Sequence, residues 1–258
     1  MAYTISIFNQ KGGVGKSTTA SNLMALLKSK GNRVLGIDVD SQGHLTKFCG
    51  VDTENENTVL ELLSDSATFE ETVKHTQFGD VIPSDRNLQI FIKIFSEDIN
   101  NVFKLQDLII AVGQNYDYII IDCPPNANQI TTAALVASNY VIIPTEAEYF
   151  SVDGVSEIAL TIEAVKKRLN PSLKILGVLI TKYQPRRTLT KLFEEKMAEF
   201  VENTLHCQIF KTKIHYGVAV PSSQAMKKSV SDFDKKSRPA RDFEAFADEV
   251  IEGVKNNG

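Results

Sequence analysis

The sequence has 258 residues, enough for one large domain with a full hydrophobic core. Its composition is ordinary for a globular protein, and its net charge of −4 excludes a uniformly basic nucleic-acid binder. Three cysteines without a C-x-x-C pair exclude a disulfide framework and a zinc site, and they suit a reducing compartment. Because the sequence shows no signal peptide and no membrane-spanning stretch, we expect a cytoplasmic protein.

Short β-branched runs alternate with helical patterns along the chain. The runs are almost continuously apolar, which is typical of parallel strands that helices cover on both faces. The predicted strands span residues 3–8, 33–38, 116–122, 139–144 and 173–180. The predicted helices span residues 17–30, 103–114, 151–168, 188–202 and 238–256. This alternation predicts an α/β fold with a doubly wound, mostly parallel β-sheet.

Two parts of the chain need separate interpretation. Residues 44–100 are rich in Asn, Asp, Thr and Ser, and we expect short helices there, packed at one edge of the sheet. The final predicted helix has an apolar stripe at i, i+3, i+7 and i+11, formed by Phe243, Phe246, Val250 and Val254. That spacing predicts a face packed on the core. With no linker or repeat in the sequence, we expect residues 1–258 to form a single domain.

The stretch FNQKGGVGKST, residues 8–18, follows a predicted strand and opens a predicted helix. Glycines here let backbone N–H groups turn toward a phosphate, and the helix N-terminus adds partial positive charge. The usual phosphate-binding pattern, G-x-x-x-x-G-K-[ST], requires glycine at position 10, where this chain has Gln10. The end of the pattern is intact. We expect Lys16 to reach the β- and γ-phosphates, Ser17 to bind Mg²⁺ and Thr18 to donate to the α-phosphate.

Two aspartate-containing motifs follow other predicted strands. The segment GIDVDSQGHLT carries Asp38 and Asp40, and YIIIDCPPN ends a strand at Asp122. The carboxyl ends of parallel strands are where ligands bind in such sheets. We expect Asp122 to hold Mg²⁺ through water, and Cys123 to be a small buried neighbour rather than a nucleophile.

Taken together, these motifs resemble the ParA/MinD family of ATPases, whose phosphate loop is called a deviant Walker A motif. The family form of the loop is K-G-G-x-G-K-[ST], as in this chain. The second motif keeps the family's D-x-D-x-Q-G, with Ser41 and His44 where Pro and Asn are usual. The stretch VIIPTEAEYFSVDGV resembles a further family segment. The resemblance runs from about residue 3 to residue 180, with weaker support beyond.

The resemblance implies a role for each motif. Lys11 would cross a two-fold interface and contact the ATP held by the partner subunit. Since two buried anionic nucleotides repel, a lysine from each side makes the dimer depend on ATP. Asp40 would position the attacking water, and Asp38 would lie near the water shell of Mg²⁺. The implied catalytic residues are Lys11, Lys16 and Asp40, and the implied metal residues are Ser17, Asp38 and Asp122. The implied nucleotide-binding residues are Lys11, Gly12, Gly13, Val14, Gly15, Lys16, Ser17 and Thr18.

Within the family, the chain resembles small ParA/Soj-type partition ATPases. Only two residues precede the first predicted strand, so we expect no N-terminal helix-turn-helix domain. This branch implies slow Mg-ATP hydrolysis stimulated by a ParB-like partner, and an ATP-bound homodimer that binds DNA on the nucleoid without sequence preference. The alternatives are a ParA-like ATPase that positions a protein cargo and a MinD-like division-site regulator. The acidic face of the final helix argues against the latter's basic membrane helix, so no membrane partner is expected.

The charge distribution supports a DNA surface in the last third of the chain. From residue 182 to residue 241 there are thirteen Lys and Arg against six Asp and Glu. Such a segment can neutralise DNA phosphates. The candidate DNA-binding residues are Arg186, Arg187, Lys227 and Lys228. A solvated surface remains the alternative for the two lysines. For adenine, the resemblance points to the Thr181-Lys182 pair and residues 214–221, without resolving which of them binds the base.

Overall fold

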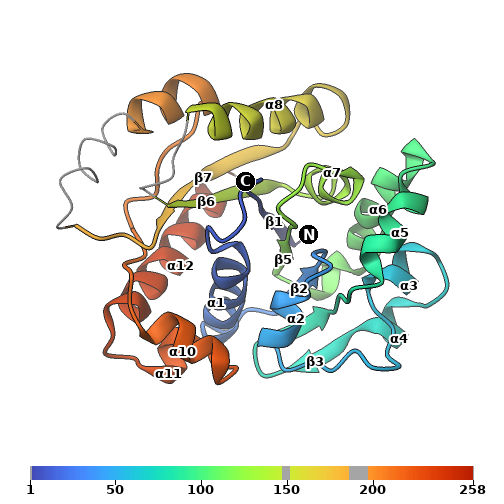
Figure 1. The fold of residues 1–258 in the computed structure, drawn as a ribbon, viewed down its shortest axis with the longest axis horizontal. Helices are drawn as coiled ribbons and strands as arrows, with labels where there is room; N and C mark the ends of the chain where they lie inside the picture. Colours follow the sequence, from blue (N-terminus) through green and yellow to red (C-terminus); the bar gives the residue numbers. More distant parts are fainter. Residues whose placement is uncertain (1, 147–151, 186–196, 258) are drawn as a thin grey trace.

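The computed structural model describes residues 2–146, 152–185 and 197–257, which form an α/β fold around one twisted sheet (Figure 1). The sheet has seven strands in the order β3-β4-β2-β5-β1-β6-β7. Neighbouring strands are parallel except for the β3–β4 pair. The strands are β1 Tyr3–Ile7, β2 Val34–Asp38, β3 Lys74–Thr76, β4 Gly79–Ile82, β5 Tyr118–Asp122, β6 Tyr140–Glu146 and β7 Lys174–Thr181.

Helices cover both faces of this sheet, so the predicted fold class is confirmed. The α-helices are α1 Lys16–Ser29, α2 His44–Phe48, α3 Val59–Leu63, α4 Phe69–Thr72, α5 Leu88–Phe95, α6 Lys104–Val112, α7 Gln129–Val136, α8 Val152–Arg168, α10 Ala219–Ala225, α11 Val230–Phe233 and α12 Arg238–Asn257. Short 3-10 turns occupy Ile99–Phe103 and Gly113–Asn115, and a π-helical turn occupies Val201–Leu205.

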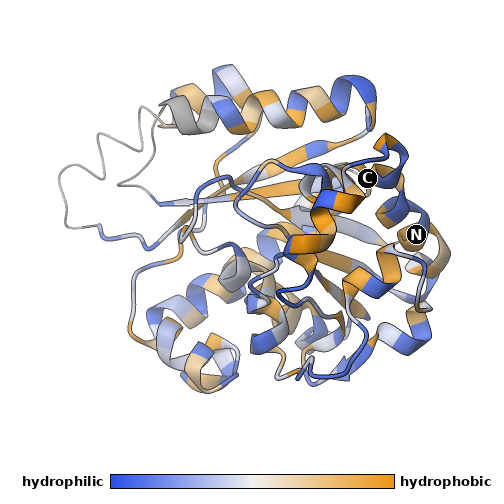
Figure 2. Cartoon of the chain, turned by 45° about the vertical axis from the view of Figure 1, so that its right-hand side comes forward, coloured by the Kyte–Doolittle hydropathy of each residue, from blue (hydrophilic) through white to orange (hydrophobic). Residues whose placement is uncertain are grey.

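Two hydrophobic cores lie on the two faces of the sheet. Alternate strand residues contribute to each: Ile119 and Ile121 of β5 belong to the core under α5 to α8, and Ile120 belongs to the core under α1 and α12. Because the central strands are buried on both faces, their residues are almost all apolar, as the sequence predicts. Figure 2 shows the hydrophobic residues gathered on these strands, with hydrophilic residues on the outer surfaces of the helices.

Residues 44–100 differ from the prediction. They contain the expected short helices, but they also contain β3 and β4, which extend the sheet at one edge. Both strands are only three or four residues long, too short for a clear periodic pattern. The second of them begins at Gly79, whose φ of +125° and close approach to the Val34 carbonyl leave no room for a side chain. Of the predicted helix 188–202, residues 188–196 lie outside the described part of the chain.

The final helix packs as its apolar stripe predicts: Phe243, Phe246, Val250 and Val254 are buried. Its acidic residues hold the preceding segment in place. Asp242 accepts hydrogen bonds from the backbone and ring of His215, and Glu249 accepts them from the backbone N–H groups of Lys211 and Thr212. This face therefore fixes residues 211–215 along α12. Within the described residues, no helix is long and apolar enough to cross a membrane.

Replacing Phe246 by Ala tests the α12 core. Its ring is fully buried and meets that of Phe210 edge-on at 5.0 Å. The Phe246→Ala variant should lose about 3–5 kcal/mol of unfolding free energy in urea titrations, because it leaves a cavity. Leu160→Ala, on a residue of α8 that is 71% exposed, is the control and should change stability by less than about 0.5 kcal/mol. Equal losses in the two variants would contradict this packing.

Candidate functional site

The glycine-rich loop connects the end of β1 to the start of α1. Gly13 and Gly15 have φ of 78° and 89°, in the left-handed region that favours glycine, and Gly15 is the N-cap of α1. Gly12 is not among the glycines with positive φ, and a side chain there would meet no atom of the described residues within 4 Å. The loop thus presents its backbone at the carboxyl edge of the sheet.

The two lysines of the loop have opposite environments. Lys16 is 7% exposed, and its Nζ donates to the Lys11 carbonyl at 2.8 Å. Burial lowers the pKa of Lys16, and the negative charge of Asp122 opposes this. Lys11 is exposed. Lys16 is therefore buried within its own site, whereas Lys11 lies at the surface of the loop.

Gln10, at the position where the usual pattern has glycine, anchors the loop to α8. Its Nε2 donates to Thr161 Oγ1 at 2.8 Å. Next to it, Asn9 accepts from the Lys11 backbone N–H at 2.8 Å and donates to the Pro144 carbonyl at 2.7 Å, at β6. Gln10, which replaces the glycine of the usual pattern, therefore attaches the loop to α8, and Asn9 attaches it to β6.

The end of β7 holds the other side of the loop. Thr181 Oγ1 donates to the Val14 carbonyl at 2.9 Å, and Lys182 Nζ donates to the Gly13 carbonyl at 2.8 Å. Lys182 also forms an ion pair with Glu146 at 2.6 Å. The family resemblance suggests the Thr181-Lys182 pair only for adenine. These contacts with the loop join residues too distant in sequence for a local pattern to reveal them.

The predicted aspartates lie side by side at the ends of β2 and β5, where Asp38 and Asp122 are register partners. Asp122 is fully buried, and among the described residues neither of its carboxylate oxygens has a hydrogen-bond partner. Burial, reinforced by the charge of Asp38, raises the pKa of Asp122 well above its usual range. The Ser17 hydroxyl lies close enough to oppose that shift without completing a hydrogen bond.

Asp38 differs because its oxygens are already in use. It accepts from the Thr46 backbone N–H at 2.9 Å, from Thr46 Oγ1 at 2.7 Å and from the Asp40 N–H at 3.1 Å. Burial raises the pKa of Asp38 to about 6 in spite of these bonds. Asp40 is 6% exposed and accepts from the Gln42 N–H at 3.0 Å. Asp38 therefore holds the following loop in shape, and Asp122 is the carboxylate with unused ligand capacity.

The residues present fit a magnesium ion. Mg²⁺ prefers oxygen ligands and usually combines one or two carboxylates with water and substrate phosphates. The unpartnered oxygens of Asp122, beside the Ser17 hydroxyl, supply that chemistry. A divalent cation would also offset the cost of burying this carboxylate.

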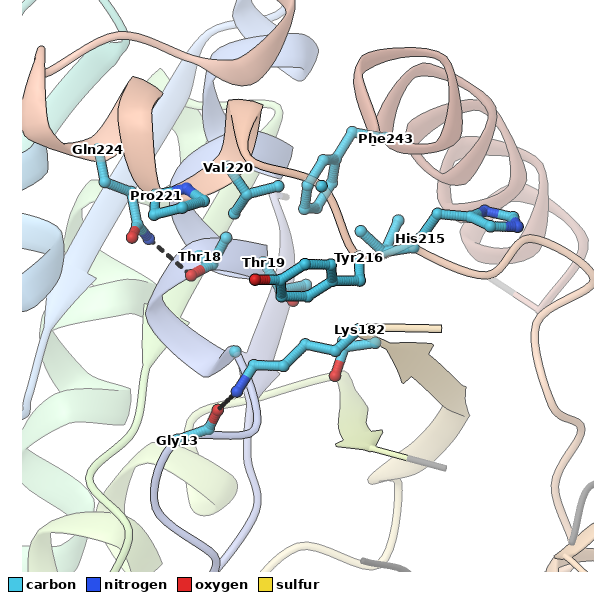
Figure 3. Close-up of a pocket in the computed structure, with 14 residues that line it drawn as sticks. Gly13, Thr18, Thr19, Lys182, His215, Tyr216, Val220, Pro221, Gln224 and Phe243 are labelled. Carbon is cyan, nitrogen blue, oxygen red and sulfur yellow. Dashed lines mark hydrogen bonds between the residues drawn. The ribbon is translucent and has the colours of Figure 1, made fainter. Parts of the chain in front are cut away.

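Two cavities meet at the loop. The larger, of about 520 Å³, contains most of the predicted site. Its lining includes Gly12, Gly13, Gly15, Lys16, Ser17, Thr18, Asp40, Gln42, His44, Lys47 and Lys227. The second, of about 360 Å³, lies between the loop and the C-terminal segment (Figure 3). Gly13, Gly15, Thr18 and Gln224 line both, and Gln224 Nε2 donates to Thr18 Oγ1 at 2.6 Å.

The predicted DNA-binding residues divide into two groups. Lys227 and Lys228 are exposed directly after α10. Lys227 also lines the larger cavity, which the sequence did not indicate. Arg186 and Arg187 lie outside the described residues.

A parallel sheet with a glycine-rich loop between β1 and α1, a buried lysine in that loop and aspartates at adjacent strand ends define a P-loop nucleoside triphosphatase. Comparison with known proteins narrows this class. A family model described as AAA domain matches residues 2–175. The sporulation initiation inhibitor protein Soj of Bacillus subtilis is 37% identical over 253 residues, which cover 97% of this chain and 98% of Soj.

Two further comparisons agree. The chromosome partitioning protein ParA of Myxococcus xanthus is 34% identical, covering 96% of this chain and 87% of its own. The crystal structure of cobyrinic acid a,c-diamide synthase from Mycobacterium smegmatis with bound ATP analogue and magnesium has a TM-score of 0.86. It is 27% identical and covers 100% of this chain and 98% of its own. The chain therefore belongs to the AAA-domain family, as a P-loop ATPase of the Soj/ParA type.

Replacing Asp122 by Asn tests the state of the buried carboxylate. The Asp122→Asn variant should gain about 1–3 kcal/mol of unfolding free energy without nucleotide, because a neutral amide costs less to bury than an unpartnered carboxylate. It should also lose Mg-dependent ATP binding, measured by calorimetry. Asp38→Asn is the matched comparison and should be destabilised, since the amide cannot accept all three hydrogen bonds that Asp38 receives. Similar destabilisation of both variants would refute this distinction.

Proposed function

We propose that the chain is a Mg-ATP-dependent DNA partition ATPase. Residues 1–258 act as a single ATPase domain in the cytoplasm, and ATP induces a sandwich homodimer that binds DNA without sequence preference on the nucleoid. A ParB-like centromere-binding partner stimulates a slow hydrolysis, after which the dimer separates and leaves the DNA. Similarity to Soj and to a chromosome partitioning ParA supports this proposal, as does the nucleotide-bound structure of a similar fold.

The observation that carries the proposal is the difference in burial between the two loop lysines. Lys16 is buried within its own site, and Lys11 is exposed beside Gly12. An exposed lysine on a phosphate-binding loop can come within reach of phosphates held by a second molecule. Across a two-fold axis each Lys11 would offset the repulsion between two bound nucleotides, which links dimerisation to ATP.

Within one subunit, the loop residues have separate tasks. Lys16 binds the β- and γ-phosphates, and Ser17 with Asp122 holds the metal. Mg²⁺, when bound, neutralises phosphate charge. Asp40, in the wall of the larger cavity, orients the attacking water. Asp38 keeps that segment in place through Thr46.

The DNA surface is assigned to the basic C-terminal segment. Lys227 and Lys228 follow α10, the helix whose Gln224 touches Thr18 in the phosphate loop. The helix α10 therefore connects the phosphate loop, which it contacts through Gln224, with the two lysines proposed to bind DNA phosphates. Because DNA affinity is linked to dimerisation, any ligand that favours the dimer also favours DNA. Arg186 and Arg187 are included from the sequence alone.

The Lys11→Ala substitution tests the dimer switch. The variant should still bind ATP, because Lys16 and the loop backbone are unchanged, but it should weaken the ATP-dependent dimer by about 3–5 kcal/mol, since an uncompensated buried charge is left at the interface. Sedimentation with a non-hydrolysed ATP analogue and Mg²⁺ measures the dimer. Lys16→Ala, which should lose nucleotide binding itself, separates the two effects. Full ATP-dependent dimerisation of Lys11→Ala would overturn the assigned role of Lys11.

The double change Lys227→Ala and Lys228→Ala tests DNA binding. It should weaken binding to every DNA sequence and reduce the slope of log affinity against log salt by about 1 per lost phosphate contact. Lys93→Ala, an exposed lysine on α5, is the control and should leave the slope unchanged. A parallel variant lacking Arg186 and Arg187 compares the second group. If neither double variant changes the slope, the proposed DNA surface is wrong.

A further inference from the structure

The turn between α10 and α11, residues 227–229, is attached to α1 at both of its ends. On one side, Gln224 Nε2 donates to Thr18 Oγ1 at 2.6 Å, a bond between residues 206 positions apart (Figure 3). On the other side, the Val230 N–H donates to Asn22 Oδ1 at 2.9 Å. Asn22 Nδ2 in turn donates to the Thr18 carbonyl at 2.9 Å. Both attachments therefore converge on Thr18, in the first turn of α1.

The end of α10 is a Schellman motif, a common way for a helix to finish. Its two hydrogen bonds run from the Lys228 N–H to the Ser223 carbonyl at 2.9 Å and from the Lys227 N–H to the Gln224 carbonyl at 3.1 Å. Lys227 has φ of +51°, in the left-handed region that residues other than glycine rarely adopt. Such a residue keeps this conformation only where its surroundings hold it. Gln224 is thus bonded to Thr18 through its side chain and to Lys227 through its carbonyl.

The path from the phosphate loop to this turn is short. Thr18, Gln224 and Lys227 all line the cavity of about 520 Å³ that contains the loop. The Lys227 carbonyl also accepts from Gln77 Nε2 at 3.4 Å, so the segment between β3 and β4 contacts the turn as well. Ser222, on the same helix, is not among the residues that line either cavity at the loop. Gln224 is therefore the α10 side chain that joins the cavity to the turn by a hydrogen bond.

The Thr18 hydroxyl can bond to Gln224 and to a nucleotide at the same time. A hydroxyl has one hydrogen to donate and two lone pairs that accept. Accepting from Gln224 uses a lone pair, so the hydrogen can be donated to the α-phosphate, which is the role expected from the loop motif. A hydroxyl that donates to an anion becomes a better acceptor, because hydrogen bonds in a chain polarise one another. A bound nucleotide would therefore strengthen the bond from Gln224 to Thr18.

We propose that Gln224 is a positioning residue that couples nucleotide binding to the DNA surface within one subunit. The nucleotide strengthens the bond to Thr18, this bond fixes the end of α10, and the turn then holds Lys227 and Lys228 in place for DNA phosphates. Less conformational freedom is lost when DNA binds a turn that is already fixed. By linkage, DNA raises the affinity for nucleotide by the same factor.

This coupling deepens the proposed function and rests on it, because it needs both an ATP site and a DNA surface. It differs from the coupling through the dimer, since it requires no second subunit. The two can therefore be separated by experiment.

The first test measures affinity for duplex DNA with and without a non-hydrolysed ATP analogue and Mg²⁺, at one salt concentration. The analogue should raise the DNA affinity of the wild type. In Gln224→Ala this increase should be about 2- to 10-fold smaller, the range that one hydrogen bond supports. The DNA affinity without nucleotide and the ATP-dependent dimer seen in sedimentation should stay as in the wild type. Ser222→Ala is the matched control on α10 and should keep the full increase.

A second test follows the turn in a single subunit. The chain has no tryptophan, so Met226→Trp, at a residue that is 61% exposed beside the turn, introduces one indole fluorophore. ADP with Mg²⁺ brings an α-phosphate to Thr18 but is not the nucleotide that induces the proposed dimer. It should change the emission of Met226→Trp, and adding Gln224→Ala should abolish that change. Ile110→Trp, at a residue of α6 that is 64% exposed, is the control and should not respond.

The outcomes distinguish the coupling from the proposed function. If the wild type fails to bind the analogue or DNA, or if the analogue does not raise its DNA affinity, the proposed function fails and the coupling fails with it. If the wild type behaves as proposed but Gln224→Ala shows the same increase in DNA affinity, only the coupling is refuted. An equal loss of DNA affinity with and without nucleotide would indicate a purely structural role and would also refute it, as would an ADP response that survives Gln224→Ala.

Discussion

The site depends on one physical constraint, the burial of the Asp122 carboxylate at the end of the central strand β5. Neither of its oxygens has a hydrogen-bond partner among the described residues. A charge in this position is unfavourable in the isolated chain, because burial removes its water and the neighbouring Asp38 repels it. The buried Lys16 only partly offsets that cost. The parallel strands create this situation, since they bring their carboxyl ends, and the side chains that follow them, to one edge. A magnesium ion bound at Asp122 would offset this cost, since its charge is opposite to that of the carboxylate.

Rigid attachments keep the loop ready for that ligand. Asn9 and Gln10 tie its start to β6 and α8, and Thr181 and Lys182 tie its middle to β7. The loop is therefore preorganised by neutral side chains and one ion-paired lysine, while Lys16 remains directed to the phosphate side. Gln224 of α10 adds a hydrogen bond to Thr18, so the C-terminal segment contacts the first turn of α1 directly.

Much of the fold and the chemistry of the loop could be predicted from the sequence, because these depend on local patterns. Buried parallel strands read as apolar runs, and the spacing of Gly15, Lys16 and Ser17 is fixed by the turn from strand to helix. What the sequence could not show arises from contacts between distant residues. The hydrogen bond from Gln10 to Thr161, the hydrogen bond from Thr181 to the Val14 carbonyl and the cavity between the loop and the C-terminal segment all require the folded chain. The short strands β3 and β4 were missed because a few residues give no periodic signal, and their pairing is set by the sheet.

Nothing within the described part of a single chain explains why position 12 is a glycine. Its backbone is unstrained, and a side chain added there would touch nothing in the described part of the chain. A survey of folding stability in the isolated subunit would therefore score this position as freely replaceable. Any requirement for glycine at Gly12 comes from what approaches the loop from outside, whether a phosphate or the loop of a second subunit. Stability measurements that include nucleotide, with and without a second copy of the chain, are therefore the ones that can detect such a requirement.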